Sequence, residues 1–300
     1  MKYKTAVLLK RVRLYNFITK RFYRWYIQHQ GRVEGKRWSR MQADEIQSLG
    51  KYGEVTVRNM RFILDRSELH DYQMLLQLQK GEVYEPEVTY YISQELKAGH
   101  TFVDIGANNG YYTILASQLV SATGKVLSFE PNHKVFDRLL NNIQVNGLKN
   151  VACFNFALAD FDGQANLYLD EKMEDGQASL KDVQQKNPVS KVIVKKSGDF
   201  FKDKGLINMI KMDVEGSEIS ILKGMEGYIY DNKDIKIIME WNASYRTFDD
   251  YSYLGNKFNI FLLLWESNTL QKHKIKKYYE IPGLSNLLLT PKRLEWPLNI

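Results

Sequence analysis

The sequence predicts an α/β fold with a mostly parallel sheet that helices cover on both faces. From residue 101 onward, short apolar runs alternate with helical stretches, which is the pattern of strands joined by crossover helices. The runs hold few polar residues, as expected for strands that are buried on both faces. The strands predicted here are Thr101–Ile105, Lys125–Glu130, Val151–Phe156, Ile207–Asp213 and Ile235–Trp241, and helices Tyr112–Leu119 and Asn132–Val145 lie between the first three.

Shorter elements flank this pattern. A strand pair, Val55–Val57 with Arg61–Leu64, and a helix over Pro86–Leu96 are predicted before it. Between the third and fourth strands lies a polar stretch, Asp170–Asn187, which we interpret as a candidate lid. Short strands around it are predicted over Ala165–Leu169 and Lys191–Lys196, and added strands, at least partly antiparallel, over Asn259–Leu264, Lys274–Ile281 and Asn286–Leu289.

The composition excludes several classes of protein. In 300 residues, a hydrophobic fraction of 44% and an aromatic fraction of 13% supply a large core and rule out a wholly disordered chain. The single cysteine, Cys153, excludes an intramolecular disulfide and a cysteine zinc finger, and it fits a reducing compartment. No apolar run approaches the roughly 20 residues that a membrane-spanning helix needs. We therefore expect a cytoplasmic protein.

Positive charge is concentrated at the N-terminus. Residues 1–40 hold twelve Lys or Arg against one acid, which gives +11, whereas the whole chain carries +7. Residues 1–28 have the spacing of a basic amphipathic helix, whose apolar side holds Leu8, Val12, Tyr15, Ile18, Phe22 and Trp25. We predict a basic extension over residues 1–80, consisting of this helix and a lead-in, and an α/β domain over residues 81–300.

Three interpretations of the basic helix stay open from the sequence. It packs on the folded domain, it docks peripherally on the anionic inner membrane surface, or it binds another anionic partner. No nucleic-acid recognition motif accompanies the helix, so we expect no nucleic-acid partner. The sequence carries no signal for an oligomeric state.

Residues 103–112 have the pattern of a ligand-binding turn. A buried strand ends near Asp104, and Gly106 and Gly110 bound a turn that leads into a helix. Such a turn brings the backbone close to a ligand and offers it the helix N-terminus. Twenty residues past Gly110, Glu130 ends the second strand, where an acid accepts hydrogen bonds from a ribose diol.

The turn does not fit a dinucleotide. A dinucleotide fingerprint that begins at Gly106 needs glycine at positions 108 and 111, where the chain has Asn108 and Tyr111. The pyrophosphate would then lose the glycine that permits its close approach. Asp104, two residues before the first glycine, suits a cationic, zwitterionic cofactor without phosphates. We therefore predict S-adenosylmethionine as the cofactor.

Several segments resemble those of the FkbM family of methyltransferases, a branch of the class I S-adenosylmethionine-dependent enzymes. The likeness spans roughly residues 80–290, with one departure: Ser197-Gly198-Asp199 stands where the family usually has Thr-Leu-Asp. The resemblance implies a Rossmann-like class I methyltransferase fold with a mostly parallel, seven-stranded sheet, and O-methylation without nicotinamide or flavin. The matching segments are residues 102–112, residues 129–132, Asn142 and Asn146 within residues 140–146, residues 157–160, and residues 210–218 leading into 222–224.

We assign cofactor-binding roles along these motifs. Asp104 is expected to contact the methionine-side amino group or its water shell, and Gly106 and Gly110 to permit backbone approach. Glu130 is expected to hold the ribose hydroxyls, and Asn132 to cap the following helix. Phe156, Ala157 and Leu158 are expected along the adenine edge. The full predicted set is Asp104, Gly106, Asn108, Gly110, Tyr111, Glu130, Asn132, Ala157, Asp213 and Glu215.

An alcohol acceptor is a poor nucleophile, so a base would help to remove its proton. Asp213 follows the fourth strand and is the first candidate, with Lys211 and Glu240 next. Glu215 and Glu218 come directly after Asp213, where they can also satisfy a helix N-terminus. Asp213 with Glu215 would suit Mg²⁺, but the sequence offers no evident third ligand, and we predict no metal.

The predicted function is methyl transfer from S-adenosylmethionine to a hydroxyl of a small-molecule or glycan acceptor, above all a saccharide or glycolipid. A natural-product O-methyltransferase and a cofactor-binding or membrane scaffold without turnover are the alternatives. Enzymes that methylate amino groups of nucleobases are excluded, because the six prolines never occur in tandem. Cytosine-C5 enzymes use a nucleophilic cysteine, whereas Cys153 lies inside a predicted strand.

Overall fold

The computed structural model describes residues 43–168, 180 and 188–292. The chain divides into two compact units, Met1–Tyr52 and Gly53–Ile300. In the first unit, residues 43–49 are helical, and the amphipathic helix predicted over residues 1–28 lies outside the described residues. Among the residues described, no helix has both the length and the apolar character needed to cross a membrane.

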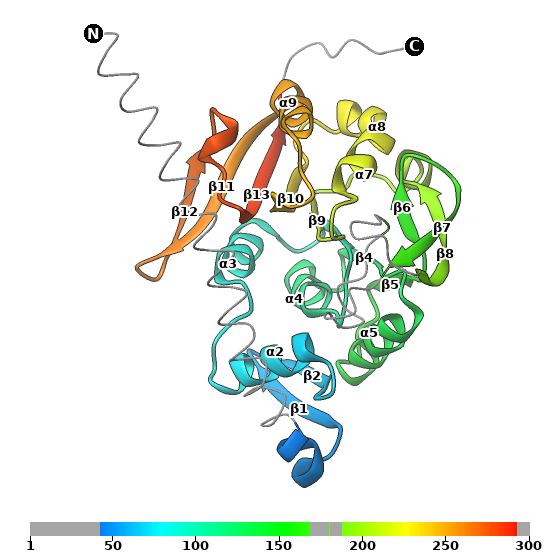
Figure 1. Cartoon of the computed structure of the whole chain (residues 1–300), viewed down its shortest axis with the longest axis vertical. Coiled ribbons are helices and arrows are strands. Elements are labelled where there is room, and N and C mark those ends of the chain that lie inside the picture. The colour runs from blue at the N-terminus through cyan, green and yellow to red at the C-terminus, as the bar shows by residue number, and fades with distance from the viewer. Residues whose placement is uncertain (1–42, 169–179, 181–187, 293–300) are drawn as a thin grey trace. The chain divides into compact units, whose positions relative to one another are not determined.

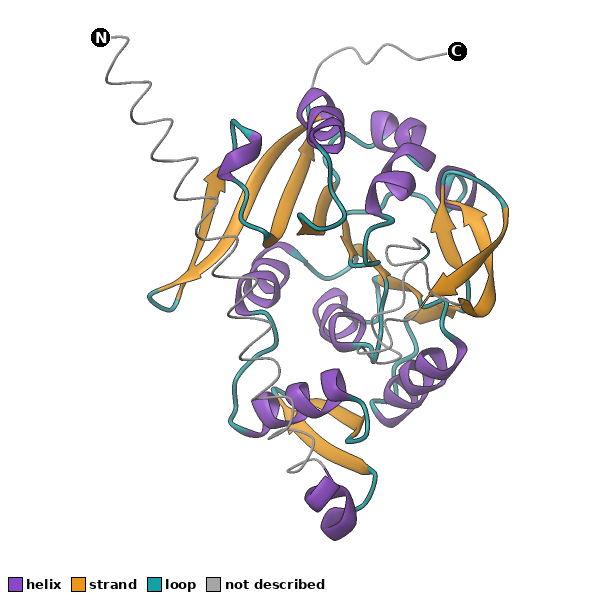
Figure 2. Ribbon diagram, in the orientation of Figure 1, coloured by secondary structure: helices purple, strands orange, loops and turns teal. Residues whose placement is uncertain are grey.

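The second unit is built on one large sheet (Figures 1 and 2). Within the described residues it has eight strands, in the order β12-β11-β13-β10-β9-β3-β4-β5. Six of them run parallel to one another, and β13 and β12 run in the opposite direction. The strands are β3 (Thr101–Ile105), β4 (Lys125–Phe129), β5 (Val151–Phe154), β9 (Met209–Met212), β10 (Lys236–Asn242), β11 (Phe258–Glu266), β12 (Thr269–Lys274) and β13 (Leu284–Pro291).

The eighth strand corrects the predicted number of seven. A two-residue turn joins β11 to β12, and its residues Ser267 and Asn268 both have positive φ, of 50° and 60°. Such a turn matches the twist of paired strands and adds a hairpin at the sheet edge. The strand predicted over Lys274–Ile281 was therefore placed too late. A 3-10 helix, η2 (Tyr278–Glu280), lies there instead.

Helices cover both faces of the sheet, as predicted. One core joins sheet residues such as Phe102 and Ile238 to the first four described helices of the unit, and the other joins Val103 and Ile237 to the last four. The first group is α2 (Leu69–Gln79), α3 (Pro86–Glu95), α4 (Tyr111–Val120) and α5 (His133–Val145), and the second is α6 (Ser197–Phe201), α7 (Glu218–Gly224), α8 (Glu226–Asp231) and α9 (Phe248–Lys257).

The hairpin β1 (Tyr52–Val57) and β2 (Met60–Asp65) belongs with this domain. Asn142 of α5 and Asn146, the residue after its C-terminus, extend their amide groups to the edge of β2. Asn142 Oδ1 accepts from Ile63 N at 2.8 Å, and the Asn146 amide bonds the N–H and carbonyl of Arg61. Side chains of the hairpin also enter the first core. The compact unit Gly53–Ile300 thus includes residues 53–80, which the sequence analysis grouped with the N-terminal extension.

A small second sheet precedes β9. It contains β6 (Ala157–Ala159), β8 (Pro188–Lys196) and β7 (Gly163–Tyr168), with β8 in the middle. The candidate lid, Asp170–Asn187, lies outside the described residues except for Leu180. At the departure from the family pattern, Gly198 is the second residue of α6. A Cβ there would come 2.3 Å from the carbonyl oxygen of Gly224, so a larger residue would not fit.

The strand order creates a switch point between β3 and β9. From β3 the chain continues to β4 and β5 on one side, and it later continues from β9 to β10 on the other. Crossover connections on opposite faces leave a crevice outside the carboxyl ends of such strands. The described fold therefore predicts a ligand site beside Ile105 and Met212.

Candidate functional site

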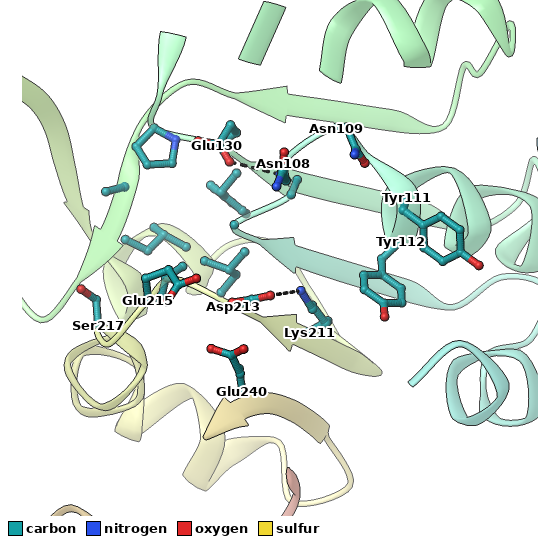
Figure 3. A pocket seen from close by; sticks show the side chains of 18 of the residues that line it. Asn108, Asn109, Tyr111, Tyr112, Glu130, Lys211, Asp213, Glu215, Ser217 and Glu240 are labelled. Carbon is teal, nitrogen blue, oxygen red and sulfur yellow. Dashed lines mark hydrogen bonds and ion pairs between the residues drawn. The ribbon is translucent and has the colours of Figure 1, made fainter. Parts of the chain in front are cut away.

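A pocket lies at this switch point (Figure 3). It encloses an empty volume of about 1090 Å³, part of which is open to solvent. Its walls come from the carboxyl ends of β3, β4, β9 and β10. Of the site residues predicted from the sequence, it brings together Gly106, Asn108, Tyr111, Glu130, Ala157, Lys211, Asp213, Glu215 and Glu240.

The turn after β3 requires glycine at its first position. Gly106 has a φ of +79°, and a Cβ there would come 1.9 Å from the carbonyl oxygen of Asp213. Its N–H and that of Ala107 both donate to Phe129 O at 2.9 Å. The turn is thereby joined to the ends of both neighbouring strands, β9 and β4.

Glu130 is buried beside this turn, with a 7% exposed side chain. Its carboxylate accepts hydrogen bonds from Asn108 N at 3.1 Å and from Asn132 N at 2.9 Å. Burial raises the pKa of Glu130 to about 7, although the two hydrogen bonds oppose that shift. A carboxylate offers about four acceptor positions, so Glu130 can still accept from a ligand.

Three of the predicted cofactor-binding residues do not line the pocket: Asp104, Gly110 and Asn132. The Asp104 carboxylate is 1% exposed and accepts a hydrogen bond from Thr113 Oγ1 at 2.7 Å, so it holds the first turn of α4. Gly110 precedes α4 with a φ of +91°. Asn132 caps α5, accepting from Lys134 N at 3.1 Å, as predicted. The geometry thus gives Asp104 no direct contact with the pocket.

The opposite end of the pocket is rich in carboxylates (Figure 3). Asp213, Glu215 and Glu240 gather there, and burial together with mutual repulsion raises the pKa of Glu240 to about 9. The same two causes raise the pKa of Glu215 to about 7. Glu215 has a φ of 50°, an unusual value for a residue other than glycine. Backbone strain of this kind is common at functional sites.

Lys211 is the buried cation of this end. Its Nζ lies 3.1 Å from Asp213 Oδ2 and 4.9 Å from the ring centroid of Tyr112. Asp213, Glu85 and Asp104 together raise the pKa of Lys211 above its usual value, although burial opposes this. A lysine that holds its proton so firmly cannot act as a base near neutral pH. The structure therefore argues against the predicted role of Lys211 as a general base.

Glu218 has a structural role. Its carboxylate accepts from the N–H groups of Val214 and Gly216 and forms a buried ion pair with Arg246. The closest group of possible metal ligands in the described residues is Asp213, Glu218 and Glu240, whose oxygens lie within 4.8 Å of one another. This group contains Glu218 in place of the predicted Glu215. Because Glu218 is already satisfied, only two of these carboxylates stay available.

The lining residues that were not predicted include four with polar side chains that contact one another in pairs: His70, Tyr84, Glu85 and Tyr112. Tyr112 Oη donates to Glu85 Oε2 at 2.6 Å, and the Tyr84 hydroxyl lies 3.1 Å from His70 Nε2. Burial raises the pKa of Glu85. Tyr112 could have been predicted, because it ends the matching segment of residues 102–112. Glu85 comes just before Pro86, and its φ of 37° could not be predicted there.

Comparisons with known proteins identify the family of this chain. Residues 104–262, more than half of the chain, match the family model described as the methyltransferase FkbM domain. The chain is 25% identical to methyltransferase 1 of Beauveria bassiana over 160 residues, which are 45% of this chain and 62% of the relative. It is 27% identical to the hexuronic acid methyltransferase AglP of Haloferax volcanii over 145 residues, 47% of this chain and 56% of the relative.

The chain thus spans less than two thirds of the length of these two curated relatives. A solved structure, the methyltransferase FkbM of Methylobacillus flagellatus, covers 73% of this chain, and 60% of its own chain is matched, at 15% identity and a TM-score of 0.41. The family match carries the assignment, since it includes the turn, Glu130 and the acidic end of the pocket. The chain belongs to the FkbM methyltransferase domain family.

Proposed function

We propose that this chain is an S-adenosylmethionine-dependent O-methyltransferase that acts on a saccharide or glycolipid hydroxyl. The observation that carries the proposal is the switch-point pocket. The Gly106 turn and Glu130 line one end of it, and the carboxyl groups of Asp213 and Glu240 line the other. When bound, S-adenosylmethionine supplies an electrophilic methyl group. The protein's part is then to align donor and acceptor and to exclude water.

The nucleoside part of the cofactor fits the end that contains Glu130. Glu130 would accept the ribose hydroxyls, and Phe156, Ala157 and Leu158 line the same pocket beside it. The side-chain oxygen of Asn108 is buried there and accepts no hydrogen bond from any described residue. A buried acceptor without a donor is costly, so a ligand that donates to Asn108 would be stabilised. These observations fit a nucleoside with its hydroxyl donors.

The acceptor hydroxyl fits the acidic end. Asp213 and Glu240 have carboxylate oxygens within 4.8 Å of each other. We assign the proton transfer to this pair, whose ionised member accepts the proton of the acceptor hydroxyl as the oxygen attacks the methyl group. Lys211, paired with Asp213, positions that carboxylate and keeps its own proton.

A saccharide is the preferred acceptor class for two reasons. Carboxylates accept hydrogen bonds from several hydroxyls at once, and one relative of this chain bears the name hexuronic acid methyltransferase. We also propose that the basic residues 1–28 hold the protein at an anionic membrane surface where a glycolipid is presented. Unchanged liposome binding after deletion of residues 1–30 would contradict the membrane proposal.

The test is methyl transfer from radiolabelled S-adenosylmethionine to a panel of glycan, glycolipid and natural-product acceptors. The proposal expects a labelled saccharide whose formation Asp213→Asn nearly abolishes while cofactor binding is kept. Glu226→Gln, at an ion pair with Lys257 outside the pocket, is the matched control. Transfer only to non-saccharide acceptors would favour the natural-product alternative. Cofactor binding with no transfer to any acceptor would favour a scaffold.

A further inference from the structure

Acidic side chains outnumber basic ones in the lining of the pocket. Five carboxylate side chains line it, against one lysine and one histidine among the described residues. Apart from Glu130, each of these carboxyl groups, Glu85, Asp213, Glu215 and Glu240, interacts electrostatically with Lys211. The imbalance determines which charge on a ligand this end of the pocket favours.

The lysine and the histidine of the lining, Lys211 and His70, already have carboxylate neighbours. Lys211 is 4% exposed, lies 3.1 Å from Asp213 Oδ2, and stacks over the ring of Tyr112. His70 Nδ1 lies 3.8 Å from Asp71 Oδ1, and Asp71 is buried. A ligand carboxylate would have to compete with these protein carboxylates for each cation. Among the described lining residues, no basic side chain is therefore left as a ready counter-ion for an anionic ligand.

Glu240 differs from Lys211 and His70 in its contacts. Within the described part of the chain, its side chain makes no hydrogen bond and no ion pair, and it lines the pocket. A carboxylate oxygen of Asp213, in the same pocket wall, lies within 4.8 Å of a Glu240 oxygen. Two carboxylates so close repel each other unless a proton, a cation or a donor group lies between them.

We propose that Asp213 and Glu240 form a subsite beside the transferred methyl group that selects for hydrogen-bond donors and cations. The acceptor is accordingly a neutral or amine-bearing sugar and not a uronate. This inference rests on the proposed function, because it places the nucleoside at Glu130 and hence the reactive end of the cofactor at the acidic end. The inference adds to the proposed function the charge of the acceptor, which is neutral or positive.

The first test compares two cofactor analogues by calorimetry. S-adenosylhomocysteine is uncharged at the position of the sulfonium, and sinefungin carries an amino group there. We expect sinefungin to bind the full-length protein at least about tenfold more tightly than S-adenosylhomocysteine, a difference of roughly 1.4 kcal/mol. Glu240→Gln should reduce this ratio to less than about threefold, and the control Glu226→Gln, which removes one carboxylate outside the pocket, should preserve it.

The outcomes separate the two proposals. Binding of neither analogue would overturn the proposed function itself. Equal binding of both, or a ratio that Glu240→Gln leaves unchanged, would overturn the selective subsite while the methyltransferase assignment stands. Each variant's thermal unfolding is recorded, so that a loss of folded protein is not taken for a loss of selectivity.

The second test uses sugars directly. The complex with S-adenosylhomocysteine is titrated with methyl glucoside, methyl glucosaminide and methyl glucuronide, which share one ring and differ in charge, and binding is followed by saturation-transfer NMR. We expect the glucosaminide and glucoside to bind more tightly than the glucuronide. A glucuronide that binds as well as the others, or the absence of binding by all three at tens of millimolar, would overturn the inference.

Discussion

The carboxylate of Glu130 accepts a hydrogen bond from the backbone N–H of Asn108, at 3.1 Å between Oε2 and the nitrogen. This contact joins the end of β4 to the glycine turn that follows β3. Asn108 itself has a left-handed φ of 49°, which points its N–H at Glu130 and leaves its side-chain oxygen buried without a donor. One acid therefore both fixes the turn and keeps acceptor capacity for a ligand.

Replacing Glu130 by alanine should weaken binding of S-adenosylhomocysteine by about 1.5–3 kcal/mol, roughly 10- to 150-fold. The variant loses a charged hydrogen-bond acceptor for the ribose and the support of the turn. Calorimetry measures the change, with Glu95→Ala as a control, because Glu95 pairs with Lys236 and does not line the pocket. An unchanged affinity in Glu130→Ala would remove Glu130 from the site.

Gly106→Ala should destabilise the protein by more than about 3 kcal/mol and abolish cofactor binding. A methyl group there would meet the carbonyl oxygen of Asp213 at 1.9 Å in a left-handed conformation. Gly147→Ala isolates the conformational part of this cost, because Gly147 also has a positive φ, of 63°, with no atom within 4 Å of its Cβ position. We expect that control to lose about 1–2 kcal/mol.

Urea unfolding of the two glycine variants separates steric from conformational effects. Equal losses in both variants would show that Gly106 is needed only for its backbone conformation. The close approach of β9 to the turn would then have no part in the stability of the site.

Two adjacent asparagines of α5 provide another matched pair. Asn142 is fully buried, accepts from Ile63 N and donates to Asn109 O, each at 2.8 Å, whereas Asn141 is exposed. Asn142→Ala should reduce the free energy of unfolding by about 2–4 kcal/mol, since it leaves two backbone groups without partners. Asn141→Ala should change it by less than about 0.5 kcal/mol. Similar values for both variants in urea unfolding would contradict the role of Asn142 in joining α5 to β2.

The stability of the domain should depend on pH through Glu240. Its pKa in the folded protein is raised to about 9, above the usual 4.5, because it is buried among like charges. The folded state therefore keeps a proton that the unfolded state releases. The corresponding stabilisation is complete below pH 4.5 and is lost as the pH rises through about 9.

Glu240→Gln cannot undergo this loss. Its advantage in Tm over the native protein should grow between about pH 6 and about pH 9, by roughly 2–10 °C for an effect on the order of 1–3 kcal/mol. Thermal unfolding at a series of pH values measures it, with Glu226→Gln as a control for the removal of a carboxylate. A difference in Tm that stays constant with pH would contradict the shifted titration.

Local sequence patterns predicted the parts of the fold that local physics determines. The strand Thr101–Ile105 is confirmed residue for residue as β3, and Asn132 caps α5 as its position before an amphipathic helix indicates. The Gly106 turn follows from the same logic, since its residue pattern is contiguous. Helix α9 was missed although its capping box, Thr247 with Asp250, is readable from the sequence.

Contacts between distant residues could not be predicted in this way. Glu218 is buried against Arg246, 28 positions away, and Glu85 is held by Asn286 of β13, 201 positions away. No sequence pattern indicated that the segment from residue 53 to 80 packs with the domain. The segment is held by the side-chain amides of Asn146 and Asn142, which bond backbone groups at the edge of β2 where a neighbouring strand would otherwise pair. Such pairings exist only once the chain has folded.

The central claim is that the switch-point pocket binds S-adenosylmethionine. Calorimetric titration of the full-length protein with S-adenosylmethionine and S-adenosylhomocysteine, with NAD as the control, tests it most directly. We predict micromolar binding of the first two and none of NAD, because Asn108 and Tyr111 occupy positions where a dinucleotide requires glycine. Binding of NAD alone, or of none of the three, would contradict the account.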